Sequence, residues 1–261
     1  PSLHGLRYKG CRLPLSSNTF VNLLTQAGYN TATIGKSHLQ PFTGLPPMGR
    51  DPEVESNPNE AWFDDPADYG AEEPDRYRAD GRYEIKTPYY GYQHVDMVTE
   101  HGDRCGGHYL QWFRDQTPDW EALHDPMNEL PHDYTCPQAY RTPVPEHLYP
   151  TAFVRDRAID YIRAQANADS PFFAFVSFPD PHHPFNPPGK YWDMYDPDDF
   201  EVSLPYSAHQ NPTPPMQFLH HNWKSAGKQM TAQTAMMLDE QQLKEAMALS
   251  AGMMAFVDDA I

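Results

Sequence analysis

A lysine and a histidine stand two residues apart directly after a predicted strand, in the run Gly35-Lys36-Ser37-His38. Lysine supplies a fixed positive charge, and histidine can donate a hydrogen bond or carry a proton near neutral pH. In extended backbone, residues two apart project to the same side, so Lys36 and His38 can converge on one anionic group. A surface lysine beside a hydrogen-bonded structural histidine is the alternative interpretation.

A histidine doublet flanked by prolines follows a second predicted strand, in the run Pro181-His182-His183-Pro184. The prolines restrict the backbone and therefore limit how far the two imidazoles can move. Neighbouring residues point to different sides, so we expect at most one of the two rings to face a given site. A histidine held in this way can act as a general acid, and a hydrogen-bonded structural histidine is the alternative.

A third group of polar side chains comprises His101, Asp103 and His108, in the segment HGDRCGGH. Histidine and aspartate can bind substrate or metal, but this spacing fits no closed zinc site. We predict that these three side chains line a substrate pocket. Metal ligation and a purely structural role are the alternatives.

The cysteines are sparse: Cys11, Cys105 and Cys136 give no disulfide framework. No readable motif supplies a base to Cys11, so Cys11 is expected to be a buried or inert thiol. A reducing, cytoplasmic compartment is mildly favoured. A periplasmic or secreted location stays open, because the sequence starts at Pro1 without a methionine and we interpret it as an internal piece of a longer protein.

Two helix-then-strand units are predicted to carry the first two groups. Residues 16–28 have helical periodicity, with Ser17 or Asn18 as the N-cap, and lead through Gly28 into a strand over 29–35. The helix should pack through one apolar face, made of Phe20, Leu23, Leu24 and Ala27.

The second unit is a helix over 151–167, capped by Thr151, followed by a strand over 171–178. The continuous apolar run of this strand predicts burial on both faces of a parallel sheet. In open α/β sheets, ligands bind at the carboxyl ends of the strands. His182 follows such an end, so the sequence places the histidine doublet where a ligand site is expected.

Three further elements and two long connections complete the outline. We expect a strand over 94–98, a helix over 106–116 and a helix over 239–261, and the loops 41–88 and 117–150 are rich in proline. The first loop is interpreted either as functional or as a solvated acidic insertion. The last helix is predicted to bury a methionine-rich face: Leu243, Met247, Ser250, Met254, Val257 and Ile261.

The overall composition excludes several classes of partner. The 261 residues include 19 Lys and Arg against 36 Asp and Glu, giving a net charge of −17. Nucleic acid and anionic membrane surfaces both require a basic face, so neither is expected as a partner. No run of 18 apolar residues occurs, so no membrane-spanning helix is expected.

Taken in order, these motifs resemble the sulfatase family of the alkaline-phosphatase-like superfamily. The resemblance rests on HGLR at 4–7, AGYNTATIGKSHL at 27–39, PHHPFNPP at 181–188 and FVDDAI at 256–261. The segment 89–112 is similar to the bacterial arylsulfatase and phosphonate monoester hydrolase branches. The resemblance implies an α/β sandwich of a largely parallel sheet with helices on both faces, incomplete in this chain. Residues 1–261 would then be a partial catalytic domain with loop insertions at 41–88 and 117–150.

The resemblance also implies roles for individual residues. Lys36 matches the family lysine that holds the sulfate oxygens, and His38 matches the histidine that contacts the formylglycine nucleophile. His182 matches the histidine beside the bridging ester oxygen. The nucleophile motif C/S-x-P-x-R is absent from the chain, as are the acidic ligands of the divalent cation, so no metal ligand is expected here. The cation, by resemblance Ca²⁺ with Mn²⁺ or Mg²⁺ as alternatives, would be bound by sequence outside this chain.

The predicted function is therefore hydrolysis of sulfate monoesters, with a small anionic ester as substrate, by a protein of which this chain is one part. We expect the isolated chain to be inactive and marginally folded. A phosphonate monoester or phosphodiester hydrolase of the same superfamily is one alternative, and a non-catalytic sulfatase-like binding protein is another. The oligomeric state is not predicted.

Overall fold

The sheet at the centre of the molecule has four strands in the order β3-β2-β1-β4. The computed structural model describes residues 12–41, 67–79, 81–203, 211–225 and 238–261. Strand β1 runs parallel to both β2 and β4, and β3 is antiparallel to β2. The strands are β1 (Asn30–Lys36), β2 (His94–Thr99), β3 (Gly106–Gly107) and β4 (Phe172–Ser177).

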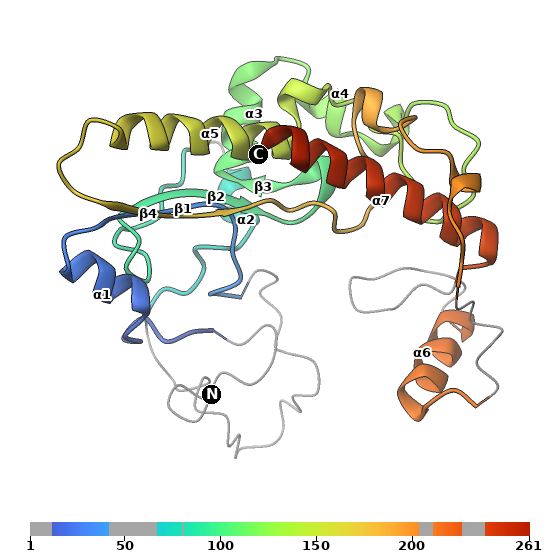
Figure 1. Ribbon diagram of the computed structural model, residues 1–261, viewed down its shortest axis with the longest axis horizontal. Coiled ribbons are helices and arrows are strands. Elements are labelled where there is room, and N and C mark those ends of the chain that lie inside the picture. Colours follow the sequence, from blue (N-terminus) through green and yellow to red (C-terminus); the bar gives the residue numbers. More distant parts are fainter. Residues whose placement is uncertain (1–11, 42–66, 80, 204–210, 226–237) are drawn as a thin grey trace.

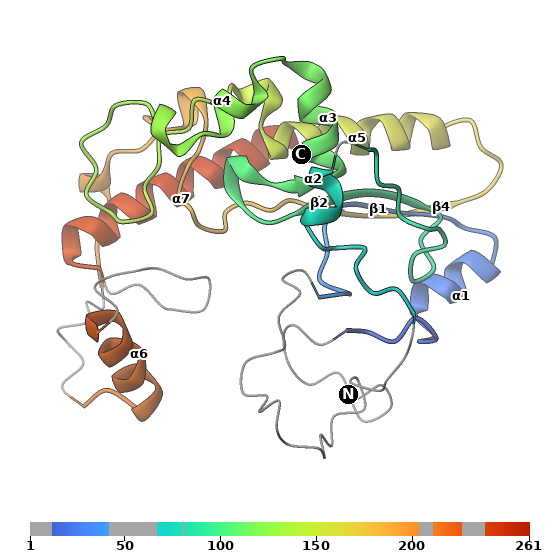
Figure 2. The same ribbon diagram turned by 180° about the vertical axis from the view of Figure 1, so that it is seen from behind.

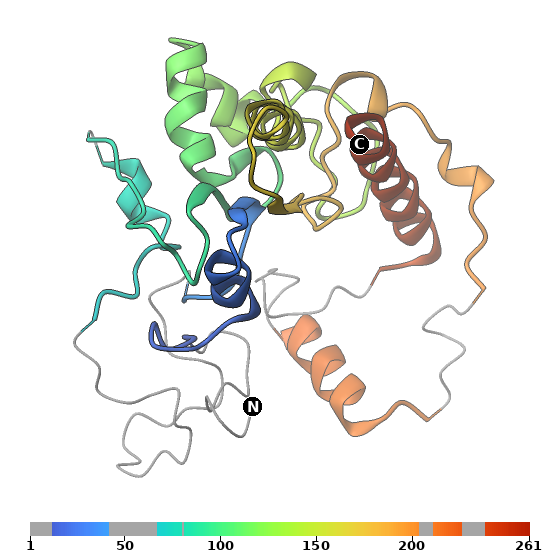
Figure 3. The same cartoon turned by 60° about the vertical axis from the view of Figure 1, so that its left-hand side comes forward.

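Helices cover both faces of this sheet, which confirms the predicted α/β class (Figure 1). Helices α3, α5 and α7 lie over one face, and α1 lies over the other; Figure 2 shows the same layers from behind. Turned further, the molecule shows α5 nearly end-on above the strands, between α3 and α7 (Figure 3). The helices are α1 (Phe20–Gln26), α2 (Asp75–Arg78), α3 (His108–Gln116), α4 (Trp120–His124), α5 (Pro150–Gln165), α6 (Pro214–Ser225) and α7 (Glu240–Ala260).

The hydrophobic core is divided between the two faces of the sheet. The larger part joins Ala32, Ile34 and Val98 of the strands to aromatic and aliphatic side chains of α3, α5 and α7. The smaller part lies on the opposite face, where Met97 of β2 packs against Tyr77 of α2 and its aromatic neighbours. Both sides of the central strands are therefore held by apolar burial, the main favourable contribution to folding. None of the helices in the described part of the chain is long and apolar enough to cross a lipid bilayer.

The predicted strand over 171–178 is correct in position and wrong in burial. Strand β4 is at the end of the strand order, and Phe172 and Phe175 are 41% and 45% exposed. Within the described residues β4 pairs with β1 on one side, and its other edge has no strand against it. An apolar run predicts burial but does not specify which neighbour provides it.

Two helices also use different faces from those predicted. In α1, Thr19 rather than Ser17 or Asn18 is the N-cap, and Val21 is buried while Phe20 and Leu23 are 61% and 54% exposed. In α7, Met254 and Ile261 are exposed. The buried face of α7 is instead Glu245, Ala246, Ala248, Leu249, Gly252, Met253 and Phe256.

The loop over 41–88 is only partly described, because residues 42–66 lie outside the described residues, as does Cys11. The remainder, from 67, contains α2 and two fully buried side chains, Glu72 and Tyr77. Residues 69–72 and 77 are thus packed into the protein, whereas most residues from 81 to 88 are exposed. Cys105 and Cys136 are free and buried.

Candidate functional site

Lys36 is the last residue of β1, at the carboxyl edge of the parallel strands. Its Nζ donates a hydrogen bond of 2.6 Å to the carbonyl oxygen of Glu100, which directly follows β2 and has a φ of 63°. The residue before the lysine must be glycine: Gly35 has a φ of 108°, and a Cβ there would lie 1.9 Å from the carbonyl oxygen of Ser177 in β4. The ends of β1, β2 and β4 thus meet around Lys36.

Three imidazoles from two of these strand ends are stacked together. The ring centroids of His101, which follows β2, and His182, which follows β4, are 3.7 Å apart. His183 lies 4.1 Å from His182, centroid to centroid. Lys36 and His38 are close enough to influence the ionisation of His101. The structure therefore brings together Lys36, His38, His101, His182 and His183.

The protonation states of these rings follow from their surroundings. Burial, then the charge of Lys36, lowers the pKa of His101 to about 3, so this imidazole is neutral at neutral pH. Its Nε2 is buried, and no group in the described structure hydrogen-bonds to it. The Nδ1 of His182 lies 2.6 Å from the carbonyl oxygen of His183. A carbonyl can only accept, so Nδ1 carries the proton, and Nε2 is the nitrogen that can gain or lose one.

The other two predicted substrate-binding residues lie elsewhere. Asp103 is buried beneath the imidazoles, and its two carboxylate oxygens accept hydrogen bonds from Thr142 and Asn186. The Nδ1 of His108 accepts a hydrogen bond of 3.1 Å from the backbone amide of Met97. The ring of His108 lines a separate cavity of about 520 Å³ at the start of β2. These hydrogen bonds of Asp103 and His108 are thus made with other residues and not with the rings of His101, His182 and His183.

Asp180 is a site residue that the sequence interpretation did not single out. It lies two residues before His182 and is 7% exposed. Burial raises its pKa to about 7, so it is partly neutral at neutral pH. Asp180 therefore opposes the positive charge of Lys36 only in part, in a protein whose net charge is −17. The signal available in the sequence was its position between an apolar strand and the histidine doublet.

A second buried acid, Glu72, holds the loop that carries His38. Its Oε1 accepts hydrogen bonds from the hydroxyls of Ser37 and Tyr89 and from the backbone amides of Leu39 and Gln40. Burial raises the pKa of this carboxyl. Its Oε2 has no hydrogen-bond partner among the described residues. One oxygen thus fixes the backbone on both sides of His38.

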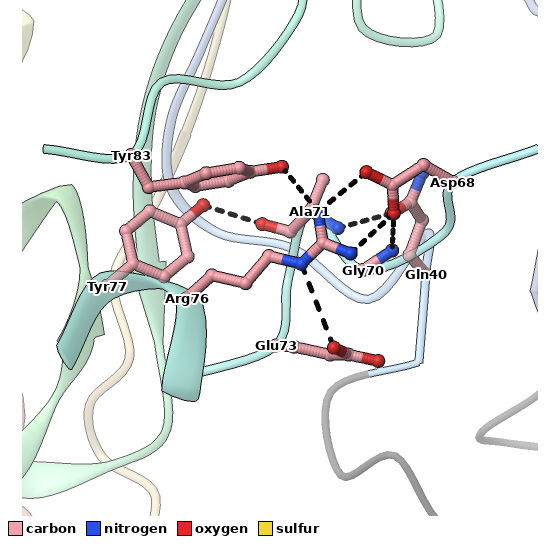
Figure 4. Close-up of polar contacts among 8 residues, drawn as sticks. All are labelled: Gln40, Asp68, Gly70, Ala71, Glu73, Arg76, Tyr77 and Tyr83. Atoms are coloured by element: carbon pink, nitrogen blue, oxygen red, sulfur yellow. Dashed lines mark hydrogen bonds and ion pairs between the residues drawn. The ribbon is translucent and has the colours of Figure 1, made fainter. Parts of the chain in front are cut away.

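The segment that carries Glu72 is itself fastened by a polar cluster, drawn in Figure 4. Two nitrogens of Arg76 each donate a 2.6 Å hydrogen bond to the carboxylate of Asp68, and this pairing lowers the pKa of Asp68. The backbone amide of Ala71 donates to Oε1 of Gln40, and the hydroxyl of Tyr77 donates to the carbonyl of Ala71. Residues 67–79, the part of the long loop that contains α2, therefore support the loop after β1 that carries His38.

Replacing Glu72 by alanine is expected to lower the free energy of unfolding by about 3 kcal/mol, because buried donors lose their acceptor. Glu72→Gln is the matched control. It keeps Oε1 as the acceptor and replaces only Oε2, which has no hydrogen-bond partner among the described residues, by an amide nitrogen. The expected loss in the free energy of unfolding is therefore below about 1 kcal/mol. Denaturant titration of the two variants measures both values. Equal losses would show that Oε1 does not hold the loop.

A divalent cation is not accommodated by the described residues of this chain. They contain no group of three or more His, Cys, Asp or Glu side chains arranged to hold a metal ion. The three imidazoles lie ring against ring, with neighbouring centroids 3.7 and 4.1 Å apart.

Comparison with known proteins gives the family. The sulfatase family profile matches residues 4–261. An arylsulfatase of Clostridium perfringens is 27% identical over 192 residues, which cover 72% of this chain and 31% of that protein. An ulvan-active sulfatase of Formosa agariphila is 35% identical over 128 residues, 47% of this chain and 22% of that protein. The aligned parts thus cover less than a third of each relative.

Solved structures agree on the fold. The phosphonate monoester hydrolase of Agrobacterium radiobacter superposes with a TM-score of 0.61 at 23% identity, covering 99% of this chain and 45% of that one. The phosphonate monoester hydrolase of Silicibacter pomeroyi gives a TM-score of 0.51 at 16% identity, covering 98% and 45%. The α/β alkaline-phosphatase-like fold expected from the sequence is confirmed, with a partial sheet of four strands. With the profile match over nearly its whole length, the chain belongs to the sulfatase family.

Proposed function

We propose that the complete protein carrying this chain hydrolyses sulfate monoesters, and that the chain supplies the cationic, substrate-facing side of the active site. The observation that carries the proposal is the convergence of Lys36, His38 and His182 at the carboxyl ends of parallel strands in a sulfatase-family chain. The proposal also includes a formylglycine nucleophile and a divalent cation, both supplied by sequence outside these residues. By resemblance the cation is Ca²⁺, with Mn²⁺ or Mg²⁺ as alternatives.

Lys36 and His182 have different tasks in the proposed reaction. Cleavage of a sulfate ester spreads negative charge over the sulfate oxygens and onto the departing oxygen, and fixed donors placed there lower the barrier. The ammonium of Lys36 would stabilise the sulfate oxygens. His182, protonated on Nε2, would donate that proton to the bridging oxygen as the bond to sulfur breaks. His38 would contact the nucleophile.

His101 adds a neutral ring beside His182. With its pKa lowered to about 3, it brings no second positive charge into contact with His182. A protonated His182 is therefore not opposed by a cationic neighbour at 3.7 Å. Its buried Nε2 can accept a hydrogen bond from a substrate hydroxyl. In this proposal His101 contacts the substrate directly. Asp103 and His108 would not contact the substrate and would affect the site only through neighbouring residues.

Hydrolysis of phosphonate monoesters or phosphodiesters is the second candidate, favoured by the two solved structures with the same fold. Turnover of nitrophenyl sulfate and of a nitrophenyl phosphonate ester by the complete protein separates the candidates. We expect the sulfate ester to have the higher kcat/KM. A higher kcat/KM for the phosphonate ester would instead identify the protein as a phosphonate ester hydrolase.

A non-catalytic sulfatase-like binding protein is the third candidate. The sequence that precedes Pro1 in the gene discriminates it, since a C-x-P-x-R segment there would provide the nucleophile. Binding of a sulfate ester without turnover, together with absence of that segment, would establish the binding function instead.

A further inference from the structure

A connected group of buried polar side chains lies in and beside the loops that carry the imidazoles. The hydroxyl of Thr142 and the amide of Asn186 donate to the two carboxylate oxygens of Asp103, at 2.6 and 2.8 Å. The hydroxyl of Tyr149 faces Oδ1 of Asn186 at 3.0 Å and Oδ1 of Asp180 at 3.5 Å. Thr151 donates to the other oxygen of Asp180 at 3.0 Å. All six side chains are buried, the most exposed being Asp180 at 7%.

This chain connects the segments that carry the site. Asp103 comes two residues after His101 in the loop following β2, and Asp180 comes two residues before His182 in the loop following β4. Asn186 belongs to the same loop, four residues beyond His182. His182 therefore lies in the sequence between Asp180 and Asn186, and both of these side chains are held by buried hydrogen bonds.

The two loops also touch directly. Gly102, next to His101, has a φ of 60°, and a Cβ on it would lie 2.8 Å from Oδ1 of Asn186 and 3.0 Å from Cγ of Pro184. The bare Cα at this position lets the loop after β4 approach the loop after β2. A larger side chain there would separate the loops that carry His101 and His182.

We propose that Asp103, Asn186, Tyr149 and Asp180 form a positioning network that fixes His182 against His101. None of the four touches the substrate in this assignment; they act through the loops that they join. Two buried carboxyls are costly to bring together, and burial raises the pKa of both. A network whose task was stability alone would be served equally well by apolar side chains, because replacing buried polar partners by apolar groups of similar shape is often neutral.

Tyr149 is the residue whose substitution tests the network best. Its hydroxyl lies between Asn186, which is bonded to Asp103, and Asp180. Tyr149→Phe removes that link and keeps the ring. Tyr161→Phe is the matched control: Tyr161 is in α5, the helix that begins directly after Tyr149, and its buried hydroxyl has no hydrogen-bond partner among the described residues. Thr151→Val is a second variant that releases Asp180 from its other side, should Tyr149→Phe fail to fold.

The first readout is the rate at which diethyl pyrocarbonate modifies His182 in the complete protein. Peptide mass spectrometry resolves His182, and the exposed His147 serves as the internal reference. A ring that is no longer held against His101 should react about threefold faster or more in Tyr149→Phe and Thr151→Val, and at the wild-type rate in Tyr161→Phe.

The second readout is steady-state kinetics, and it alone rests on the proposed function. Tyr149→Phe should lower kcat by about tenfold with KM changed less than about twofold, because misplacement of a catalytic group affects the transition state more than substrate binding. Unchanged labelling of His182 in both network variants would overturn the network, whatever kcat does. If the wild-type protein hydrolyses neither ester while Tyr149→Phe still accelerates labelling, the proposed function falls and the network stands.

Discussion

Replacement of Lys36 by alanine in the complete protein is expected to lower kcat/KM for nitrophenyl sulfate by about 100-fold or more, because a fixed donor to the transition-state oxygens is lost. Lys36 is the cation at the centre of three strand ends, and the nearest acidic group of the network, Asp180, is held partly neutral.

Lys190→Ala provides the control for this variant. Lys190 is exposed and pairs with Asp259 on the surface, so its loss should leave kcat/KM within about twofold of wild type. Thermal unfolding of both variants separates a catalytic effect from loss of the bond between Lys36 and the Glu100 carbonyl. A Lys36→Ala protein that folds normally and keeps wild-type turnover would contradict the site assignment.

His182→Ala is expected to be the second large loss, also about 100-fold or more in kcat/KM, with the size depending on the leaving group. A general acid matters most when the departing oxygen is basic and least when it is a good leaving group such as nitrophenolate. The loss should therefore be greater for an alkyl or sugar sulfate than for nitrophenyl sulfate. Parallel kinetics on both esters measure the difference.

An exposed histidine gives the comparison for this variant. His147 lies outside the stacked rings, so His147→Ala should behave as wild type on both esters. If the loss in His182→Ala is the same for good and poor leaving groups, His182 does not act as the proton donor. A role in placing the substrate would then replace it.

The residues that the sequence located well are those whose signal is local. Lys36 and His38 follow an extended run with a glycine in it, and His182 follows an apolar strand ended by prolines. The spacing of Lys36 and His38 and the position of His182 after a strand end are local signals, and the family resemblance implied that the three share one site. The structure adds His101 to the same edge from β2.

What the sequence could not provide depends on contacts between distant segments. Glu72 meets the loop after β1 through hydrogen bonds spanning about 35 positions, and Asn186 meets Asp103 across 83 positions. No period or motif marks such pairs. The buried faces of α1 and α7 and the burial of β4 were mispredicted for a related reason: an apolar residue is buried only where another element covers it.

The uncovered side of β4 has a consequence for anyone who produces these 261 residues alone. Among the described residues no strand pairs with the outer edge of β4, and Phe172 and Phe175 of this strand are 41% and 45% exposed. An edge of this kind is a template on which further chains can add. Isolated molecules should accordingly join edge to edge as their concentration rises, and a charged residue in place of Phe175 is the natural means of keeping them apart.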